Sequence, residues 1–470
     1  MSSFNFGFED FEDFKDDNRL ADLAAHFERE GSALYFDSDT LEEIASYYFE
    51  QGRFEESLRV VDRSLEIHPY SSDGWMRRGI LLNNMGRHAE ALDAYEKALD
   101  LNPTDLETMI NRGITLDSID EPARALEAYE DVLRLNPRNE EALFNKGVTL
   151  ERLNRIAEAI NVFEECADVN PEHPEVWYEL GFCFDRMEKE AESIECYDRH
   201  LDIDPYSQDA WYNRGIVLNR VGRYREAIES YDMAIVIADE FASAHYNRGN
   251  ALANLGQLKE AILSYKRVLE IEGNDAATCY NIALAFEELK LYESSIYYFE
   301  KAVEADDEYA EAWYGLGCCY DALERFDDAL TFFNRAIVLN AETPDFWHAK
   351  ADCAYNLGRL AEAINAYRTV VKITPRNKDA WMDFAETLFE AGQLEEALEA
   401  YGKALQLKPD CAKTYISQAR AQLALGNADE SVRSLKMAFG LDPNQKEHLP
   451  DTHPELYGDK KIRRLLGLDR

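Results

Sequence analysis

The chain has 470 residues, of which 50 are Lys or Arg and 92 are Asp or Glu, so its formal net charge at pH 7 is −42. This acidic balance argues against nucleic acid and anionic membranes as partners, because both are bound through clustered basic side chains. It favours a basic partner, although solubility of a long chain is a simpler explanation. No run of about 18 apolar residues occurs, so we expect no membrane-spanning helix.

The eight cysteines form no C-x₂-C pair, and most of them occupy small or apolar positions of expected helices. We therefore expect buried free thiols in a reducing compartment, and neither a disulfide framework nor a zinc site. The first ten residues, MSSFNFGFED, lack the basic and apolar regions of a signal peptide. Together these features predict a cytoplasmic protein.

Residues 1–37 are expected to contain a tail and an N-terminal capping helix. Within residues 1–16, acidic residues alternate with the rings of Phe4, Phe6, Phe8, Phe11 and Phe14. Such a segment is typical of a tail that becomes ordered on contact, either by covering the first helix or by docking on a partner or on its own chain. Residues 18–30 then carry an apolar helical stripe, formed by Leu20, Leu23, Ala24 and Phe27.

From residue 38 to residue 445 the sequence repeats every 34 residues without insertion, which gives twelve repeats. They begin at residues 38, 72, 106, 140, 174, 208, 242, 276, 310, 344, 378 and 412. The eighth position is Gly or Ala, and the twentieth is Ala or Ser, in all twelve. In residues 310–343, two amphipathic helical stripes follow one another, formed by Trp313, Leu316, Gly317 and Tyr320 and then by Ala329, Phe333 and Ala336.

This order of residues resembles the W-x₂-L-G-x₂-Y…A-x₃-F pattern of the tetratricopeptide (TPR) repeat. The resemblance implies an all-α, right-handed superhelical solenoid of twelve tandem helix–turn–helix units with terminal capping helices. A proline at position 32 closes eight of the repeats. The four repeats beginning at 208, 242, 276 and 310 lack it, so we expect the middle of the array to be less stiff; they carry Asp239, Gly273, Asp307 and Ala341 instead.

Residues 446–470 leave the 34-residue register and contain Pro450 and Pro454. The sequence DKKIRRLLGL that follows places Ile462, Leu465 and Leu466 on one stripe beside four basic residues. We interpret this segment as a C-terminal capping helix, because a repeat array needs an end with one polar face. A basic docking segment is the alternative.

No catalytic motif is present. The nine histidines are scattered, and the chain has no H-E-x-x-H, P-loop, G-x-G-x-x-G after a strand, or G-x-S-x-G sequence. We therefore predict that the protein is not an enzyme and holds no cofactor or metal.

In the fold that the chain resembles, the first helix of each repeat lines a concave groove, with positions 5, 6 and 12 at or near it. Position 5 carries six consecutive aromatic residues, Phe144, Tyr178, Tyr212, Tyr246, Tyr280 and Tyr314. Such rings suit an extended peptide, although tyrosine is common there in the family pattern.

Position 6 carries amides that can pair with an extended backbone, or with neighbouring helices: Asn111, Asn145, Asn213, Asn247 and Asn281. This ladder is similar to the one in the TPR superhelix of O-GlcNAc transferases, and Glu179 interrupts it. Position 12 adds acids that favour Lys- or Arg-bearing ligands: Asp117, Glu151, Asp185, Glu287 and Asp321.

We predict a monomeric protein–protein interaction scaffold that binds an extended or helical peptide segment, of basic character, in this groove. The alternatives are self-assembly through the Phe-rich tail, and a non-catalytic subunit that recruits substrates to an enzyme complex. Nucleic-acid binding is disfavoured, because its basic stripe would consist of three position-13 residues, Arg152, Arg186 and Arg220.

Overall fold

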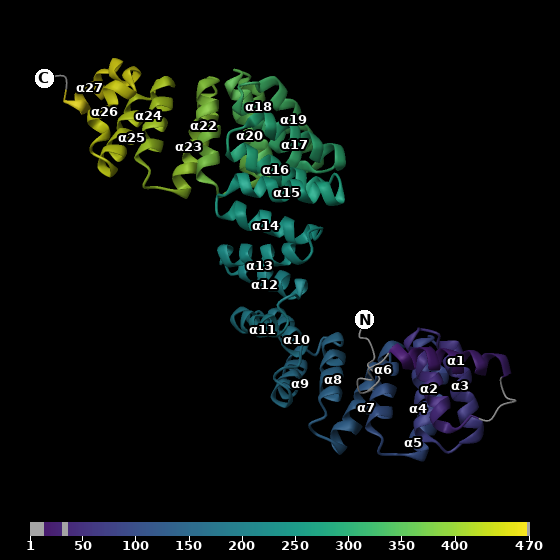
Figure 1. Cartoon of the computed structure of the whole chain (residues 1–470). Coiled ribbons are helices and arrows are strands. Elements are labelled where there is room, and N and C mark those ends of the chain that lie inside the picture. Colours follow the sequence, from purple (N-terminus) through teal and green to yellow (C-terminus); the bar gives the residue numbers. More distant parts are fainter. Residues whose placement is uncertain (1–13, 31–35, 468–470) are drawn as a thin grey trace. The chain divides into compact units, whose positions relative to one another are not determined.

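The computed structural model describes residues 14–30 and 36–467, in which every regular element is a helix (Figure 1). The chain divides into two compact parts, Met1–Arg223 and Tyr224–Arg470, hereafter the N-terminal and C-terminal parts. Phe4, Phe6, Phe8 and Phe11, to which we assigned a covering or docking role, lie outside the described residues.

Helices α2 to α12 of the N-terminal part follow the predicted order of first and second helices. The bounds are α1 (Phe14–Glu30), α2 (Ser38–Glu50), α3 (Phe54–Ile67), α4 (Ser72–Asn84), α5 (His88–Leu101), α6 (Leu106–Ser118), α7 (Pro122–Leu135), α8 (Glu140–Arg152), α9 (Ile156–Val169), α10 (Val176–Arg186), α11 (Glu190–Ile203) and α12 (Gln208–Arg220).

The C-terminal part continues in the same way and ends with three short elements. Its bounds are α13 (Tyr224–Ile237), α14 (Ala242–Asn254), α15 (Leu258–Glu272), α16 (Ala276–Glu288), α17 (Tyr292–Ala305), α18 (Ala310–Ala322), α19 (Phe326–Leu339), α20 (Pro344–Asn356), α21 (Leu360–Ile373), α22 (Lys378–Glu390), α23 (Leu394–Leu407), α24 (Ala412–Ala424), α25 (Ala428–Leu441), α26 (Gln445–Thr452), the 3₁₀ helix η2 (Pro454–Gly458) and α27 (Lys460–Leu466). The prediction of an all-α helix–turn–helix array is confirmed.

Local chemistry sets where these helices start and where each pair turns. In seven of the twelve repeats, the residue just before the first helix caps it with its side chain. Asp37, for example, accepts the Thr40 N–H at 2.8 Å, and Asn139 accepts the Ala142 N–H at 2.8 Å. Between the two helices of each repeat, position 15 has positive φ, as at Gly52 with φ 71°. Five non-glycine residues adopt this left-handed geometry too, namely Asp120, Asn154, Glu188, Lys290 and Glu324.

The glycine at position 8 leaves room for a ring at position 24 of the same repeat. A Cβ on Gly147 would lie 2.4 Å from the fully buried Phe163 ring, and a Cβ on Gly317 would lie 2.4 Å from Phe333. These glycines therefore permit the close crossing of the two helices.

Repeat 8 solves the same packing problem differently. It has Ala283 at position 8, and its ring, Phe299, lies so close to Gly315 of repeat 9 that a Cβ there would be only 2.3 Å away. Gly315 stands at position 6, where asparagine stands in repeats 3, 4, 6, 7 and 8. The asparagine ladder thus ends where a buried ring needs the space.

Position 20 completes the helix crossing. Where it is serine, the hydroxyl donates to the carbonyl of position 8 on the first helix, as from Ser193 to Gly181 (2.8 Å) and from Ser295 to Ala283 (2.8 Å). The buried hydroxyl is thereby satisfied, which explains why only alanine and serine occur there.

Apolar residues of the terminal elements pack on the neighbouring repeats. Ala24 of α1 is buried against Leu41 and Ile44 of α2. At the other end, Leu449, Leu456 and Ile462 are buried in a cluster with Ile416 and Leu435. This end consists of α26, η2 and α27, where the sequence suggested one capping helix.

Six of the eight cysteines are buried, and all are free. Cys411 is an exception, because it is half-buried at the N-terminal end of α24, where most other repeats have Asp, Ser or Asn. Within residues 14–30 and 36–467, no helix is both long enough and apolar enough to cross a membrane.

Candidate functional site

The predicted site residues lie on the first helices, and we call the surface formed by positions 5, 6 and 12 of these helices the ladder face. Within the N-terminal part, consecutive first helices contact one another from α4 to α12. In the C-terminal part, α16 contacts α18 and α18 contacts α20. Each part therefore carries a continuous stretch of this surface.

In the N-terminal part, the ring and amide ladders are linked by a hydrogen bond between repeats. The Nδ2 of Asn213 on α12 donates to the hydroxyl of Tyr178 on α10 at 2.9 Å. Both side chains are half-buried. No further bond of the Asn213 Oδ1 is present among the described residues, so this oxygen and the tyrosine hydroxyl hydrogen stay available.

The C-terminal part repeats this arrangement. The Nδ2 of Asn281 on α16 donates to the hydroxyl of Tyr246 on α14, again at 2.9 Å. The two residues are 35 positions apart, as are Tyr178 and Asn213. The same bridge, which we call the Tyr–Asn bridge, therefore recurs in both parts.

Two other ladder asparagines, Asn111 and Asn145, differ from these two. Asn111 is only 7% exposed. Asn145 donates its Nδ2 to the Glu141 carbonyl of its own helix at 2.9 Å. Asn247 and Tyr212 are half-buried. The predicted asparagine ladder is therefore not uniform, and its amides serve neighbouring groups of the fold as well.

The rings at position 5 also support the helix pairs. Each of those below packs at a tilt against the ring at position 24 of its own repeat, with centroids 5.7–5.9 Å apart. Such edge-on contacts stabilise the packing of two aromatic rings. The pairs are Phe144–Phe163, Tyr178–Tyr197, Tyr246–Tyr265, Tyr280–Phe299 and Tyr314–Phe333.

In the N-terminal part, the acids of position 12 pair with the arginines of position 13 in the next repeat. Arg152 lies 2.9 Å from Asp117, which also accepts the Thr149 hydroxyl at 2.5 Å. Arg220 pairs with Asp185. Arg186 lies 3.9 Å from Glu151. The acidic stripe and the arginine stripe, which the sequence presented as two separate surfaces, thus largely neutralise each other.

The C-terminal part has the acids without the arginines. Ala322 and Asn356 stand at position 13 after Glu287 and Asp321. No lysine, arginine or histidine of the described residues lies within ion-pair distance of either carboxylate. Burial raises the pKa of both groups, as it also raises that of Asp117 despite the arginine beside it. This stretch of the ladder face therefore carries uncompensated negative charge.

Glu179 replaces asparagine at position 6 of repeat 5. Burial, reinforced by the charge and hydrogen bonding of the neighbouring Glu151, raises its pKa to about 8. At neutral pH the Glu179 carboxyl is therefore largely protonated and can donate to Glu151, as an amide at this position would.

His348 stands at position 5 of repeat 10, after the last ladder tyrosine. Its Nδ1 lies 3.1 Å from Asp352, and its Nε2 lies 3.1 Å from Asp383 of the next repeat. Hydrogen bonds to these two carboxylates raise the pKa of His348 to about 10, despite burial. The histidine is therefore a charged link between α20 and α22.

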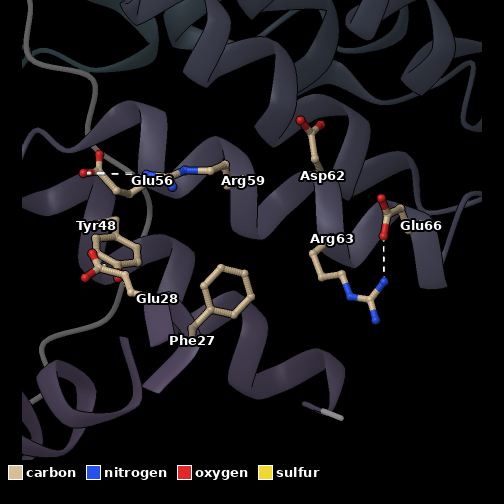
Figure 2. Close-up of a pocket in the computed structure, with 8 residues that line it drawn as sticks. All are labelled: Phe27, Glu28, Tyr48, Glu56, Arg59, Asp62, Arg63 and Glu66. Atoms are coloured by element: carbon tan, nitrogen blue, oxygen red, sulfur yellow. Dashed lines mark hydrogen bonds and ion pairs between the residues drawn. The ribbon is translucent and has the colours of Figure 1, made fainter. Parts of the chain in front are cut away.

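A pocket with a cavity volume of about 330 Å³ lies apart from the ladder face, between α1, α2 and α3 (Figure 2). Phe27 and Tyr48 supply its aromatic walls, and one face of α3 supplies charged side chains. Arg63 pairs with Glu66 at 2.6 Å, so part of this charge is satisfied locally. Its full lining consists of Phe27, Glu28, Tyr48, Glu56, Arg59, Asp62, Arg63 and Glu66.

Family profiles of the tetratricopeptide repeat match the chain, with short gaps, from residue 72 to residue 449. The matched segments are 72–105, 111–167, 149–208, 219–256, 242–275, 276–309, 310–342, 348–411 and 388–449. The chain is a tetratricopeptide-repeat protein.

Solved TPR structures are similar to this TPR chain in fold. One is YrrB, described as a TPR protein with an unusual peptide-binding site, at 22% identity over 38% of this chain and 93% of its own, with a TM-score of 0.36. Another is yeast Tom70, at 16% identity over 92% and 99% of the two chains, with a TM-score of 0.36. A TPR protein of Parabacteroides merdae has 19% identity over 56% and 98%, with a TM-score of 0.39. Curated proteins gave no match.

Sequence reasoning missed the pairs that connect neighbouring TPR repeats. The Tyr–Asn bridges, the pairs of Asp117 with Arg152 and of Asp185 with Arg220, and that of His348 with Asp383 all join residues 35 positions apart. This spacing is one repeat plus one residue. These pairs could have been found by comparing position 5 of each repeat with position 6 of the next repeat, and position 12 of each repeat with position 13 of the next.

In the described part of the chain, no group of three or more His, Cys, Asp or Glu residues is arranged to hold a metal ion.

Proposed function

We propose that this TPR array is a protein–protein interaction scaffold whose ladder face binds an extended, basic segment of a partner protein. The observation that carries the proposal is the Tyr–Asn bridge, which has the same geometry at Tyr178–Asn213 and Tyr246–Asn281. Each bridge orients one amide oxygen and one hydroxyl group. A peptide unit offers the complementary N–H donor and C=O acceptor.

The rings beside the bridges support recognition of backbone in preference to one particular side chain. Tyr280 and Tyr314 are half-buried and are held by neighbouring rings, with Tyr280 4.9 Å from Tyr309 and Tyr314 5.0 Å from Phe346 between centroids. Rings that are already fixed lose little conformational freedom when a ligand binds.

The basic character of the partner is supported by charge. Glu287 and Asp321 follow Tyr280 and Tyr314 by seven residues, which is two helical turns, on α16 and α18. Among the described residues, no basic side chain lies within ion-pair distance of either carboxylate. A lysine or arginine of the ligand would restore the interactions that these carboxylates lose on burial. We therefore place the basic residues of the ligand against repeats 8 and 9.

The test uses a random peptide library displayed on phage and panned against the full chain. Selected peptides are measured as labelled synthetic peptides by fluorescence anisotropy. We expect enrichment of lysine and arginine, and about tenfold weaker binding to the Asn213→Ala or Asn281→Ala variant, because each loses about 1–1.5 kcal/mol of hydrogen bonding. Asn365→Ala is the matched control, since Asn365 is an exposed asparagine on the second helix α21.

Two results would contradict the proposal. Peptides that bind both bridge variants as tightly as the wild-type chain would remove the ladder face as the binding surface. Selected peptides without enrichment of basic residues would leave the face but overturn the assignment of a basic ligand.

A further inference from the structure

Two devices restrain the junctions between successive repeats. One is the proline at position 32, which fixes φ and ends the second helix. The other is a side chain at position 4 of the next repeat, which bonds to the carbonyl of that same position 32. In Trp75, for example, the indole N–H donates to the Pro69 carbonyl at 3.0 Å. We call this bond the junction bond.

Junctions that lack the proline keep the junction bond in three cases out of four. The indole N–H groups of Trp313 and Trp347 donate to the Asp307 and Ala341 carbonyls, each at 2.9 Å. The Nε2 of His245 lies 3.1 Å from the Asp239 carbonyl and takes the same role. A histidine in place of tryptophan thus preserves the connection where proline is missing.

The fourth case is the junction between α15 and α16. Its position 32 is Gly273, and its position 4 is Cys279, a short and fully buried side chain that cannot span to the loop as an indole does. Among the junctions from α3 to α24, all of which lie in the described part of the chain, it alone has neither a proline at position 32 nor a tryptophan or histidine at position 4. The junctions before Met109, Leu143 and Tyr415 also lack the tryptophan or histidine, but each of them retains its proline.

The backbone of this junction differs as well. The other ten junctions contain a turn, which a backbone hydrogen bond closes in eight of them, whereas residues 273–275 form no turn. Helix α15 runs one residue further than α13 and α17, to Glu272. Gly273 follows with φ 88° and ψ −163°, a region open essentially to glycine, and no atom lies within 4 Å of the place where a Cβ would be.

The ladder face has a Tyr–Asn bridge at this same junction. Tyr246 lies on α14 and Asn281 on α16, so their hydrogen bond connects the repeats on either side of Gly273. The other bridge, between Tyr178 and Asn213, crosses a junction that has both Pro205 and the bond from Trp211 to the Pro205 carbonyl. The two bridges are alike, but only one of them crosses a restrained junction.

We propose that the α15–α16 junction is a hinge, and that the Tyr246–Asn281 bond is its latch on the ladder face. The hinge lets the ladder face of the C-terminal part adjust its curvature to a bound segment. The adjustment to a ligand rests on the proposed function, whereas the opening of the junction in the free chain does not. Proline, turn and indole would each oppose such opening, and all three are missing here.

Hydrogen exchange of the free, full-length chain, followed by mass spectrometry, tests the hinge without any ligand. We expect the amides of residues 271–278 to exchange about tenfold faster than those of the equivalent residues 305–312, because local opening exposes the first turn of α16. Equal protection of the two segments would overturn the proposal. A phage-selected peptide should then slow exchange in residues 271–278; failure of any peptide to bind would count against the proposed function and leave the result on the free chain intact.

Four variants, in two matched pairs, sharpen this test. Trp313→Phe keeps a ring but removes the junction bond from a junction that has no proline, so exchange in residues 305–312 should rise about tenfold. Trp381→Phe is the matched control, because Pro375 remains, and we expect less than about a threefold change. Tyr246→Phe opens the latch and should accelerate exchange in residues 271–278, whereas Tyr178→Phe should leave residues 203–210 unchanged. An equal response of the two members of either pair would contradict the hinge.

Discussion

The two parts of the chain have the same kind of ladder face but different electrostatics. In the N-terminal part, Asp117, Glu151 and Asp185 face arginines of the next repeat. In the C-terminal part, Glu287 and Asp321 face Ala322 and Asn356 at the equivalent places. An acidic stripe in a repeat sequence therefore says little about the local field until the next repeat is examined at a spacing of 35 residues.

Cross-repeat links also differ between the parts. In repeat 5 of the N-terminal part, the protonated Glu179 takes the place of an amide and links to Glu151 of the preceding repeat. The C-terminal part uses a charged histidine held between two aspartates in repeats 10 and 11. One link depends on keeping a proton on an acid, and the other depends on keeping a proton on a base. Both should weaken as pH rises, in different pH ranges.

The largest effect is expected from filling the space beside the buried rings. Gly147→Ala in the N-terminal part and Gly315→Ala in the C-terminal part each place a Cβ within 2.4 Å of a phenylalanine ring. We expect each to lower the free energy of unfolding by about 2–3 kcal/mol, measured by urea denaturation. Gly402→Ala is the control, because its Cβ would meet no atom within 4 Å. It should stabilise the chain by about 0.5–1 kcal/mol.

These two variants also distinguish packing within a repeat from packing between repeats. Gly147 faces the ring of its own repeat, whereas Gly315 faces Phe299 of the preceding one. If Gly315→Ala proves as harmless as Gly402→Ala, the ring of repeat 8 has room to move, and the account of why the asparagine ladder ends at Gly315 is wrong.

The next effect concerns His348. Because its pKa in the folded chain, about 10, lies above the usual 6.5, its stabilising contribution is complete below pH 6.5 and disappears as pH rises through 10. His348→Gln should cost about 1–2 kcal/mol at pH 6, a value reduced for solvent screening because the side chain is 35% exposed. The cost should shrink toward pH 10.5, as measured by urea denaturation across that range. A cost that does not vary with pH would show that the ring contributes only by packing.

Substitution of Glu179 should have a smaller effect on the free energy of unfolding, opposite in sign to that of His348→Gln. Folding raises the pKa of Glu179 from 4.5 to about 8. Between these pH values the folded chain keeps the proton that the unfolded chain has released, so the free energy of unfolding falls as pH rises from 4.5 to 8. Glu179→Gln should therefore stabilise the chain by about 1 kcal/mol at pH 9 relative to wild type, and much less at pH 5. Thermal unfolding at the two pH values measures this. Destabilisation of the variant at pH 9 would mean that the ionised carboxylate is well accommodated.

The fold followed from the sequence because its signals are local and repeated. Small residues at positions 8 and 20, helix-ending prolines and a constant 34-residue period all act within one helix pair. The candidate site followed less completely, because its groups meet only when two repeats stack. Asn213 and Tyr178 bond to each other, and Arg220 neutralises Asp185, through the stacking of α10 and α12. The proton on Glu179 depends on its burial, which the identities of neighbouring residues do not give.

The smallest expected effect tests the charge difference between the parts directly. Ala322 is exposed at the end of α18 and lies 35 residues after Glu287, which is the spacing of Asp117 and Arg152. Ala322→Arg should therefore supply the counter-charge that the C-terminal part lacks. We expect about threefold weaker binding of lysine-containing peptides selected on the wild-type chain, equivalent to about 0.7 kcal/mol for a partly screened ion pair.

Ala322→Gln is the control, because it adds similar length without charge and should leave the affinity unchanged. The reciprocal variant, Arg152→Gln, uncovers Asp117 in the N-terminal part and should strengthen binding of the same peptides if they reach that surface. Anisotropy titrations at low and high salt separate charge from shape, since only an electrostatic difference between the variants shrinks as salt screens it. Equal affinities of the arginine and glutamine variants at low salt would show that the unpaired acids of repeats 8 and 9 do not meet the basic residues of the ligand.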